Sequence, residues 1–162
     1  MSVNEYDESN CPVFGSMSPE EREHVRQIAE YKTFQKGQTV IRQRDEVPQG
    51  LWMLNRGSCQ VVKDLEGGAE QQVDMLEPGA IFGEMSFFDP APHSATVRAF
   101  EECELMFLPA EKIETLRILD LTAAYKLIRN AGQIMASKLR SMGYYTLDLF
   151  PAARTRHDAS RE

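Results

Sequence analysis

The hydrophobic positions of this chain change their spacing twice, from helical to extended and back to helical. Near the start, Ser18, Pro19 and Glu21 form a capping box with proline at the first helical position, and apolar residues follow at helical spacing. This pattern predicts a short helix that ends at about Tyr31. From Phe34 onward the apolar residues fall in short extended runs, which glycine and proline turn signals separate.

Short extended runs of this kind are typical of an antiparallel sandwich or barrel. The runs that we expect to form strands are residues 39–41, 50–54, 58–62, 71–75, 95–99 and 103–108. Residues 64–70, which contain Gly67 and Gly68, predict a hairpin connection between two of them.

The helical spacing returns after Pro109. It predicts a short amphipathic helix over 110–119 and a longer one from Leu121 to about Met142. The long helix has one broad apolar face, which either packs only on its own domain or also associates with a second copy. The predicted organisation is a polar extended arm (1–16), one folded domain (17–142, with strands at about 33–109 and helices at 110–142) and a polar tail (143–162).

Composition and charge restrict the classes of function. The 162 residues suffice for one domain, and 42% hydrophobic with 27% charged residues is typical of soluble globular proteins. The net charge of −7 lacks the positive field that drives nucleic-acid binding, so we expect no direct DNA binding. No apolar run is long enough to span a membrane, and the polar, acidic start does not resemble a secretory signal. We therefore expect a cytoplasmic protein that does not contact membranes.

The cysteines Cys11, Cys59 and Cys103 lie far apart and form no CxxC pair, and the three histidines are scattered as well. This spacing does not favour a zinc site or a disulfide framework. We expect buried or half-buried thiols and no cofactor.

One segment, residues 78–97, carries the candidate chemistry. Gly83 lacks a Cβ and permits a tight bend or the close approach of a ligand. The short helical start that follows it offers free backbone N–H groups to an anion. Ser86 and Ser94 add hydroxyl donors, and Glu84 can accept hydrogen bonds from a diol.

This segment resembles the phosphate-binding cassette of cyclic nucleotide-binding domains, the family of the cAMP receptor protein and the protein kinase A regulatory subunits. The resemblance covers about Met17 to Met142 and rests on Phe34-x-Lys36-Gly37, Gly50-Leu51-Trp52-Met53-Leu54-x-x-Gly57 and Phe82-Gly83-Glu84 with Pro92-x-Ser94-Ala95-Thr96-Val97. It implies a mainly β fold, a jelly-roll-like β-barrel flanked by an N-terminal helix and a long C-terminal helix.

The resemblance also implies roles for individual residues. Glu84 would hold the ribose 2′-hydroxyl, and Ser94 would donate to the cyclic phosphate. The full set of candidate ligand-binding residues is Phe82, Gly83, Glu84, Met85, Ser86, His93, Ser94 and Ala95. The family has arginine where this chain has His93. Arginine offers a permanently charged fork, whereas imidazole is shorter and largely uncharged at neutral pH, so the resemblance implies weakened or altered phosphate recognition.

Three hypotheses about function remain open at this point. The resemblance implies a stand-alone regulatory or sensor domain, because only 20 residues follow Met142, too few for a winged helix-turn-helix. The domain would bind cAMP or cGMP and signal through its C-terminal helix to a partner protein, with a homodimer through that helix left open. The second hypothesis is a ligand-independent interaction module, and the third is a binder of another ligand, such as a cyclic dinucleotide or an apolar molecule.

Gly83 and Glu84 favour the ligand-binding hypothesis, whereas His93 favours the interaction module. An enzyme is not expected, because no nucleophile, metal cluster or oriented triad accompanies His93 and Glu84.

Overall fold

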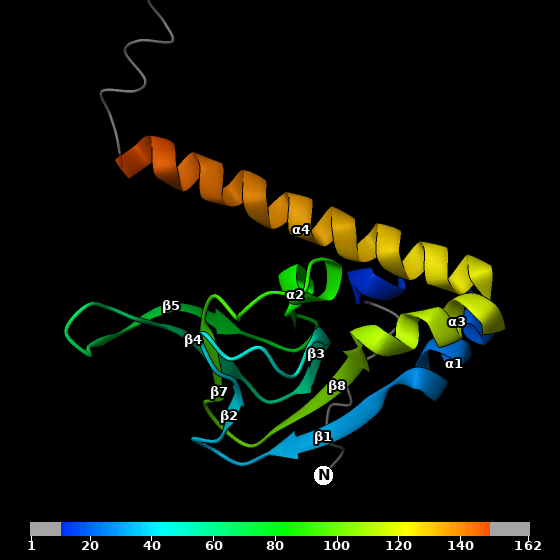
Figure 1. Cartoon of the computed structure of the whole chain (residues 1–162), viewed down its shortest axis with the longest axis horizontal. Coiled ribbons are helices and arrows are strands. Elements are labelled where there is room, and N and C mark those ends of the chain that lie inside the picture. Colours follow the sequence, from blue (N-terminus) through cyan, green and yellow to red (C-terminus); the bar gives the residue numbers. More distant parts are fainter. Residues whose placement is uncertain (1–10, 150–162) are drawn as a thin grey trace, which may run out of the picture.

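The computed structural model describes residues 11–149, with side chains up to Met142, as two β-sheets flanked by helices (Figure 1). In chain order the elements are the 3-10 helix η2 (Pro12–Phe14), α1 (Pro19–Ile28), β1 (Glu30–Phe34), β2 (Thr39–Ile41), β3 (Gly50–Arg56), β4 (Cys59–Asp64), β5 (Glu70–Leu76), β6 (Ile81–Phe82), α2 (Glu84–Phe88), β7 (Thr96–Ala99), β8 (Cys103–Pro109), the 3-10 helix η3 (Ala110–Lys112), α3 (Ile113–Leu119) and α4 (Leu121–Leu149). The expected strands and the order of helix, strands and helices are confirmed.

The strands form two four-stranded antiparallel sheets, in the orders β1-β8-β3-β6 and β2-β7-β4-β5. Their hydrogen-bonded ladders do not close on one another within the described residues, so the expected barrel is not confirmed. What the chain has is a β-rich, two-sheet fold with flanking helices, including a long C-terminal helix.

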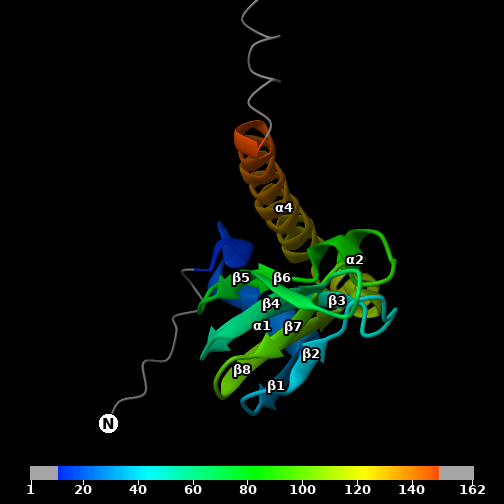
Figure 2. The same ribbon diagram turned by 90° about the vertical axis from the view of Figure 1, so that its left-hand side faces the viewer.

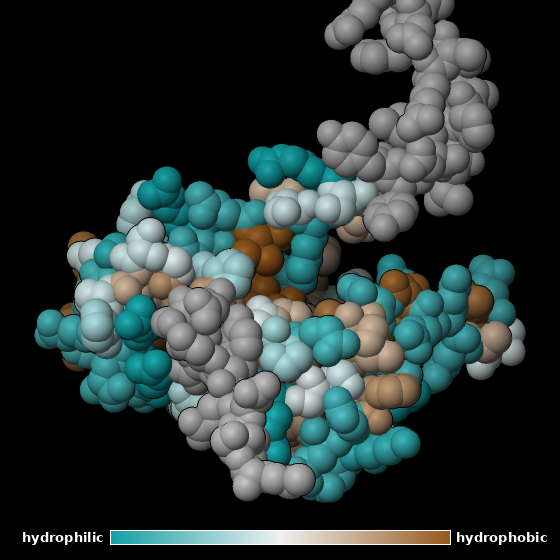
Figure 3. Space-filling model, turned by 180° about the vertical axis from the view of Figure 1, so that it is seen from behind, coloured by the Kyte–Doolittle hydropathy of each residue, from teal (hydrophilic) through white to brown (hydrophobic). Residues whose placement is uncertain are grey.

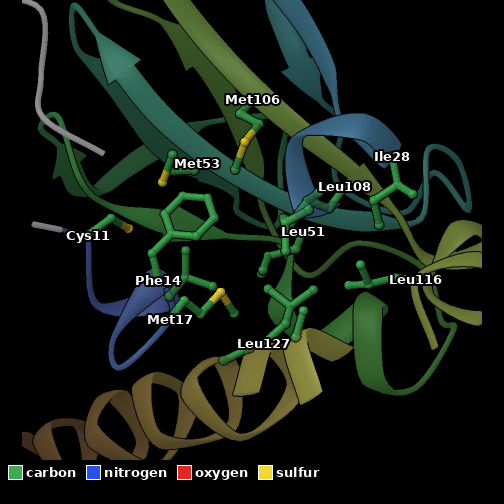
Figure 4. Close-up of a cluster of buried hydrophobic side chains, with 14 of the residues drawn as sticks. Cys11, Phe14, Met17, Ile28, Leu51, Met53, Met106, Leu108, Leu116 and Leu127 are labelled. Carbon is green, nitrogen blue, oxygen red and sulfur yellow. The ribbon is translucent and has the colours of Figure 1, made fainter. Parts of the chain in front are cut away.

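Strand β3 is buried on both of its faces and so connects two hydrophobic clusters. Side chains alternate across a strand. Trp52 and Leu54 therefore enter the cluster between the sheets, where Trp52 stacks on Phe107 with ring centroids 4.3 Å apart. Leu51 and Met53 point the other way, toward the helices. Figure 4 shows this second cluster, in which side chains from β3, β8, η2 and α4 converge.

The extended arm that we expected does not hold for residues 11–16. Pro12–Phe14 form a 3-10 helix, and Val13 and Phe14 are buried in the cluster beneath α4. Asn130 of α4 fixes this segment, because its Nδ2 donates to the carbonyl oxygens of Val13 at 3.0 Å and Gly15 at 2.8 Å. Cys11 and Met17 lie in the same cluster, so the apolar residues of this segment together bury it. Residues 1–10 lie outside the described part.

The capping box at the start of α1 is confirmed in both directions. The backbone N of Glu21 donates to Ser18 Oγ at 3.1 Å, and the backbone N of Ser18 donates to Glu21 Oε2 at 2.8 Å. The helix ends at Ile28 rather than at about Tyr31, because Glu30 and Tyr31 already pair with β8. Long-range strand pairing here overrides the local helical pattern.

Helix α4 crosses over η2 and α2 and extends past the sheets (Figures 1 and 2). Its start is capped by Asp120, whose Oδ1 accepts from the backbone N of Ala123 at 3.0 Å. The helix continues to Leu149, so residues 143–149, which we assigned to the tail, are helical; residues 150–162 lie outside the described part.

The three cysteines are buried, as expected, and none of them forms a disulfide within the described residues. None of the helices in the described part has the length and apolarity that crossing a membrane requires.

Candidate ligand-binding cassette

Gly83 sets the geometry of the segment between β6 and β7. Its φ of +76° lies in the left-handed region, and it stands at the N-cap of α2. A Cβ at this position would lie 2.6 Å from the carbonyl oxygen of Gly50 and 3.1 Å from Cδ1 of Trp52. The absence of a side chain therefore allows the backbone of the cassette to pack directly on β3. The close approach at Gly83 is thus one between two parts of this chain.

The candidate residues of β6 and α2 face in different directions. Phe82 belongs to the core between the sheets and stacks on Trp52, with ring centroids 5.9 Å apart. Met85 is exposed on the outer side of α2. Glu84 and Ser86 are both buried, but they lie on different sides of this short helix: Glu84 contacts α4, and Ser86 contacts His93.

His93 lies beneath α2 with 5% of its surface exposed. Its Nδ1 is 3.2 Å from Ser86 Oγ, whereas its buried Nε2 has no hydrogen-bond partner among the described residues. The backbone of His93 is fixed by the loop after β2: its N donates to the carbonyl of Asp45 at 2.9 Å, and its carbonyl accepts from the N of Arg44 at 2.8 Å. The structure thus brings Ser86 and His93 together.

The last two candidate residues complete the segment. Ser94 is exposed and Ala95 is half-buried, just before β7 begins. Ser94 lies outside the strand pairing of β7, and its hydroxyl takes no part in the buried contact between Ser86 and His93. A hydroxyl at an exposed turn of this kind is accessible to a ligand from solvent.

One residue of this site was not predicted from the sequence. Lys138 reaches the cassette from α4, and its Nζ lies 2.8 Å from Glu84 Oε1 and 2.7 Å from the carbonyl oxygen of Ile81. The sequence does contain a signal for it. Lys138 lies four residues after Ile134 and seven after Ala131, and these two residues pack against the domain. The Lys138 side chain is 43% exposed, so its stem packs along this face while its ammonium reaches the acidic and carbonyl partners at the edge of the domain.

The nearest arginine along the chain does not contribute its charge to the cassette. Arg98, in β7, forms an ion pair across β4 with Glu70 of β5, with Nη–Oε distances of 3.0 and 3.2 Å. The hydrogen bond from Arg98 lowers the pKa of the Glu70 carboxyl, in the direction that pairing with a cation produces.

A cavity of about 360 Å³ lies beside the cassette, between the β5–β6 turn and α4. Residues 74–81, Pro12, Ile134 and Lys138 line it. Apolar surface is visible in this part of the molecule, between α4 and the sheets (Figure 3). No group of three or more potential metal ligands occurs within the described residues.

Comparisons with known proteins agree with this architecture. The family model of the cyclic nucleotide-binding domain matches residues 31–118. The chain is 31% identical over 148 residues to the cyclic AMP receptor protein of Thermus thermophilus, covering 90% of this chain and 65% of that protein. It is 35% identical over 95 residues to a cAMP-dependent protein kinase regulatory subunit of Mucor circinelloides, covering 59% of this chain and 22% of the subunit.

Solved structures show the same likeness. The crystal structure of the Thermus thermophilus catabolite activator protein has a TM-score of 0.75 at 28% identity, and the match covers 86% of this chain and 63% of that one. A cyclic nucleotide-binding domain from Methylobacillus flagellatus shares the fold, with a TM-score of 0.74 at 21% identity over 86% of this chain and 76% of that one. The chain thus spans about two thirds of its bacterial relative and about a fifth of the kinase subunit. It belongs to the cyclic nucleotide-binding domain family.

Proposed function

We propose that this chain is a regulatory sensor domain that binds a cyclic nucleotide at residues 82–95 and transmits the signal through α4 to a partner chain. Family membership supports the ligand class. The observation that carries the proposal is the contact of Lys138 with Glu84 at 2.8 Å. Because Glu84 is the residue that the family likeness assigns to the ribose, one carboxylate serves both the ligand and the helix.

This shared carboxylate gives a route from ligand to helix. A ribose hydroxyl that donates to Glu84 changes the interaction of that carboxylate with Lys138, and therefore the free energy of the docked position of α4. The Lys138 side chain is 43% exposed, so solvent screening limits the ion pair to about 1 kcal/mol. A change of that size shifts the ratio of two helix positions by about fivefold.

His93 supports the further proposal that phosphate recognition is weak. Its Nδ1 is occupied by Ser86, and it replaces the arginine that the family uses. Loss of a charge-assisted contact of that kind costs about 2–5 kcal/mol, or about 30-fold to several thousand-fold in affinity. We therefore propose a ligand of modest affinity that is sensed at high concentration.

The outer face of α4 supports a second copy of the chain as the partner. Large apolar side chains are exposed along it in two groups with spacings of three or four residues, separated by eleven residues: Leu121, Tyr125 and Ile128, then Leu139 and Met142. The half-buried Gly132 and Met135 occupy the intervening positions, so the row follows a heptad spacing that is exposed at both of its ends. A seam of this kind is self-complementary between two parallel copies, whereas the opposite face of α4 already packs on its own domain.

Hydrogen exchange with and without millimolar cAMP or cGMP tests the ligand and the helix together. We expect slower exchange in residues 82–95 and changed exchange in α4 beyond Ala131. Slower exchange in the cassette with unchanged exchange in α4 would contradict signalling through the helix. No change in either segment would favour the ligand-independent interaction module, and a response only to a cyclic dinucleotide would favour the different-ligand hypothesis.

Sedimentation equilibrium tests the dimer. We expect a dimer for the wild type and a monomer for Ile128→Glu, which places a charge in the seam. Ile118→Glu is the matched control, because Ile118 is more exposed than Ile128 but lies on α3. A wild type that stays monomeric at high concentration would contradict the second copy as partner.

A further inference from the structure

Two of the three buried thiols lie against each other between the sheets. Cys59 stands at the start of β4 and Cys103 at the start of β8; both residues are fully buried, and their Sγ atoms are 3.7 Å apart. The two strands belong to different sheets, whose ladders do not join within the described residues. The thiol pair is therefore a contact between the sheets that strand pairing does not supply.

The turns that precede these cysteines hold the two strand ends together. The backbone N of Phe100 donates to the carbonyl oxygen of Ser58 at 3.0 Å, and Ser58 Oγ donates to Glu101 Oε1 at 2.9 Å. Gly57 lies so close to Cys103 that an added Cβ would be 2.9 Å from both its Cα and its Cβ. Because the two backbones are already in contact, a bond between the sulfur atoms requires them to approach by about 1.7 Å.

We infer that Cys59 and Cys103 form a redox modification site, at which a peroxide converts the thiol pair into a disulfide that links the two sheets. This inference is independent of the proposed function, because neither cysteine belongs to residues 82–95 or to α4. The third cysteine, Cys11, is an internal comparison: it is equally buried, but its Sγ donates to the carbonyl oxygen of Gly79 at 3.5 Å.

The two thiols differ in how readily they lose a proton. The hydrogen bond that the Cys59 thiol donates lowers the pKa of Cys103, whereas the same contact, followed by burial, raises the pKa of Cys59. Since the thiolate is the nucleophile, Cys103 is the residue that attacks the peroxide.

The reaction then proceeds in two balanced steps. The Cys103 sulfur takes one oxygen of hydrogen peroxide and becomes a sulfenic acid, while the O–O bond breaks and the other oxygen leaves as water. The Cys59 sulfur attacks the sulfenic sulfur, the S–O bond breaks, and a second water leaves as the disulfide forms. The two sulfur atoms together lose two electrons to the peroxide, and both thiol protons leave in the two waters.

An exposed turn gives the oxidant access to the buried pair. Phe100, Glu101 and Glu102 are exposed directly before Cys103, so local opening of this turn admits a molecule as small as hydrogen peroxide. The disulfide would join residues 44 positions apart in the sequence. A link over that distance restricts the unfolded chain, so the oxidised form should be the more stable one.

Peptide mapping without reductant tests the inference on the reduced, full-length chain treated with millimolar hydrogen peroxide. We expect the tryptic peptides 57–63 and 99–112 to be cross-linked, and dithiothreitol to separate them. Cys11→Ala is the matched control and should form the same cross-link, whereas Cys59→Ala and Cys103→Ala should not. The oxidised wild type should unfold at a higher urea concentration than the reduced form, and Cys103→Ala should show no such difference.

The wild-type map decides the outcome even if a variant fails to fold. A cross-link between the two peptides in the folded chain supports the site. A disulfide that involves Cys11, separate sulfenic or sulfinic acids at Cys59 and Cys103, or a cross-link that forms only in urea would each overturn the inference. Two thiols that stay unreacted in the folded chain would overturn it as well.

Discussion

Replacing Gly83 by alanine tests whether the cassette is packed directly on β3. The change adds a single methyl group at a residue with φ +76°, where it would lie 2.6 Å from the carbonyl oxygen of Gly50. That oxygen belongs to the backbone of a central strand and cannot rotate away. The variant must therefore either strain the left-handed turn or displace the cassette.

The magnitude follows from two separate costs. A non-glycine residue in the left-handed region costs about 1–2 kcal/mol. Overpacking a buried contact adds about 1–3 kcal/mol, so Gly83→Ala should lower the free energy of unfolding by about 2–5 kcal/mol. Gly37→Ala is the matched control, because Gly37 has φ +86° but nothing within 4 Å of its added Cβ.

Urea unfolding of the wild type and the two variants separates these costs. Both variants carry the backbone strain and the same change in unfolded-chain entropy, so their difference reports the contact with β3 alone. We expect Gly83→Ala to lose about 1–3 kcal/mol more than Gly37→Ala, which is a large share of a typical domain stability of about 5–15 kcal/mol. Equal losses in the two variants would refute the close packing of the cassette on β3.

Three further predictions concern the helices. The hydrogen bond from the Ala123 backbone, followed by that from His24, holds the pKa of Asp120 below its ordinary value of 3.8, so its contribution to stability is complete above that pH and disappears as the pH falls. Thermal unfolding between about pH 2 and 5 should therefore vary less with pH in Asp120→Asn, and identical slopes would contradict this account. Ser18→Ala should lower the unfolding free energy by about 1 kcal/mol in urea by removing the capping box, and no loss would contradict its role. Leu127→Ala should lose about 2–5 kcal/mol in the same assay, because Leu127 is fully buried beneath α4, and a loss below 1 kcal/mol would contradict tight docking of that helix.

The parts of the fold that can be predicted from the sequence are those that depend on neighbouring residues. The capping box at Ser18, the turn glycines and the extended apolar runs act over a few residues, and the structure places helices and strands where they predict them. The cassette is predictable for the same reason, since Gly83 and Glu84 are neighbours in the sequence.

The remaining features depend on contacts between distant residues. The strand that begins at Glu30 is imposed by β8, more than 70 residues away in sequence, and the burial of Phe14 is imposed by α4. The contact of Lys138 with Glu84 joins residues 54 positions apart. No local pattern encodes such pairs; only the position of Lys138 on the packed face of α4 gave an indication.

Thermal unfolding with added nucleotide tests the central claim, that the cassette is a cyclic nucleotide site built around Glu84. Wild type and Glu84→Gln are melted with millimolar cAMP, cGMP, AMP or cyclic di-GMP, and Glu77→Gln serves as the exposed control. A ligand at about 100 times its dissociation constant stabilises a protein by about 2.7 kcal/mol, which raises the Tm by several degrees. We predict this rise with a cyclic mononucleotide in the wild type and the control, and its absence in Glu84→Gln. An unchanged Tm with every nucleotide, or an equal rise in Glu84→Gln, would contradict the claim.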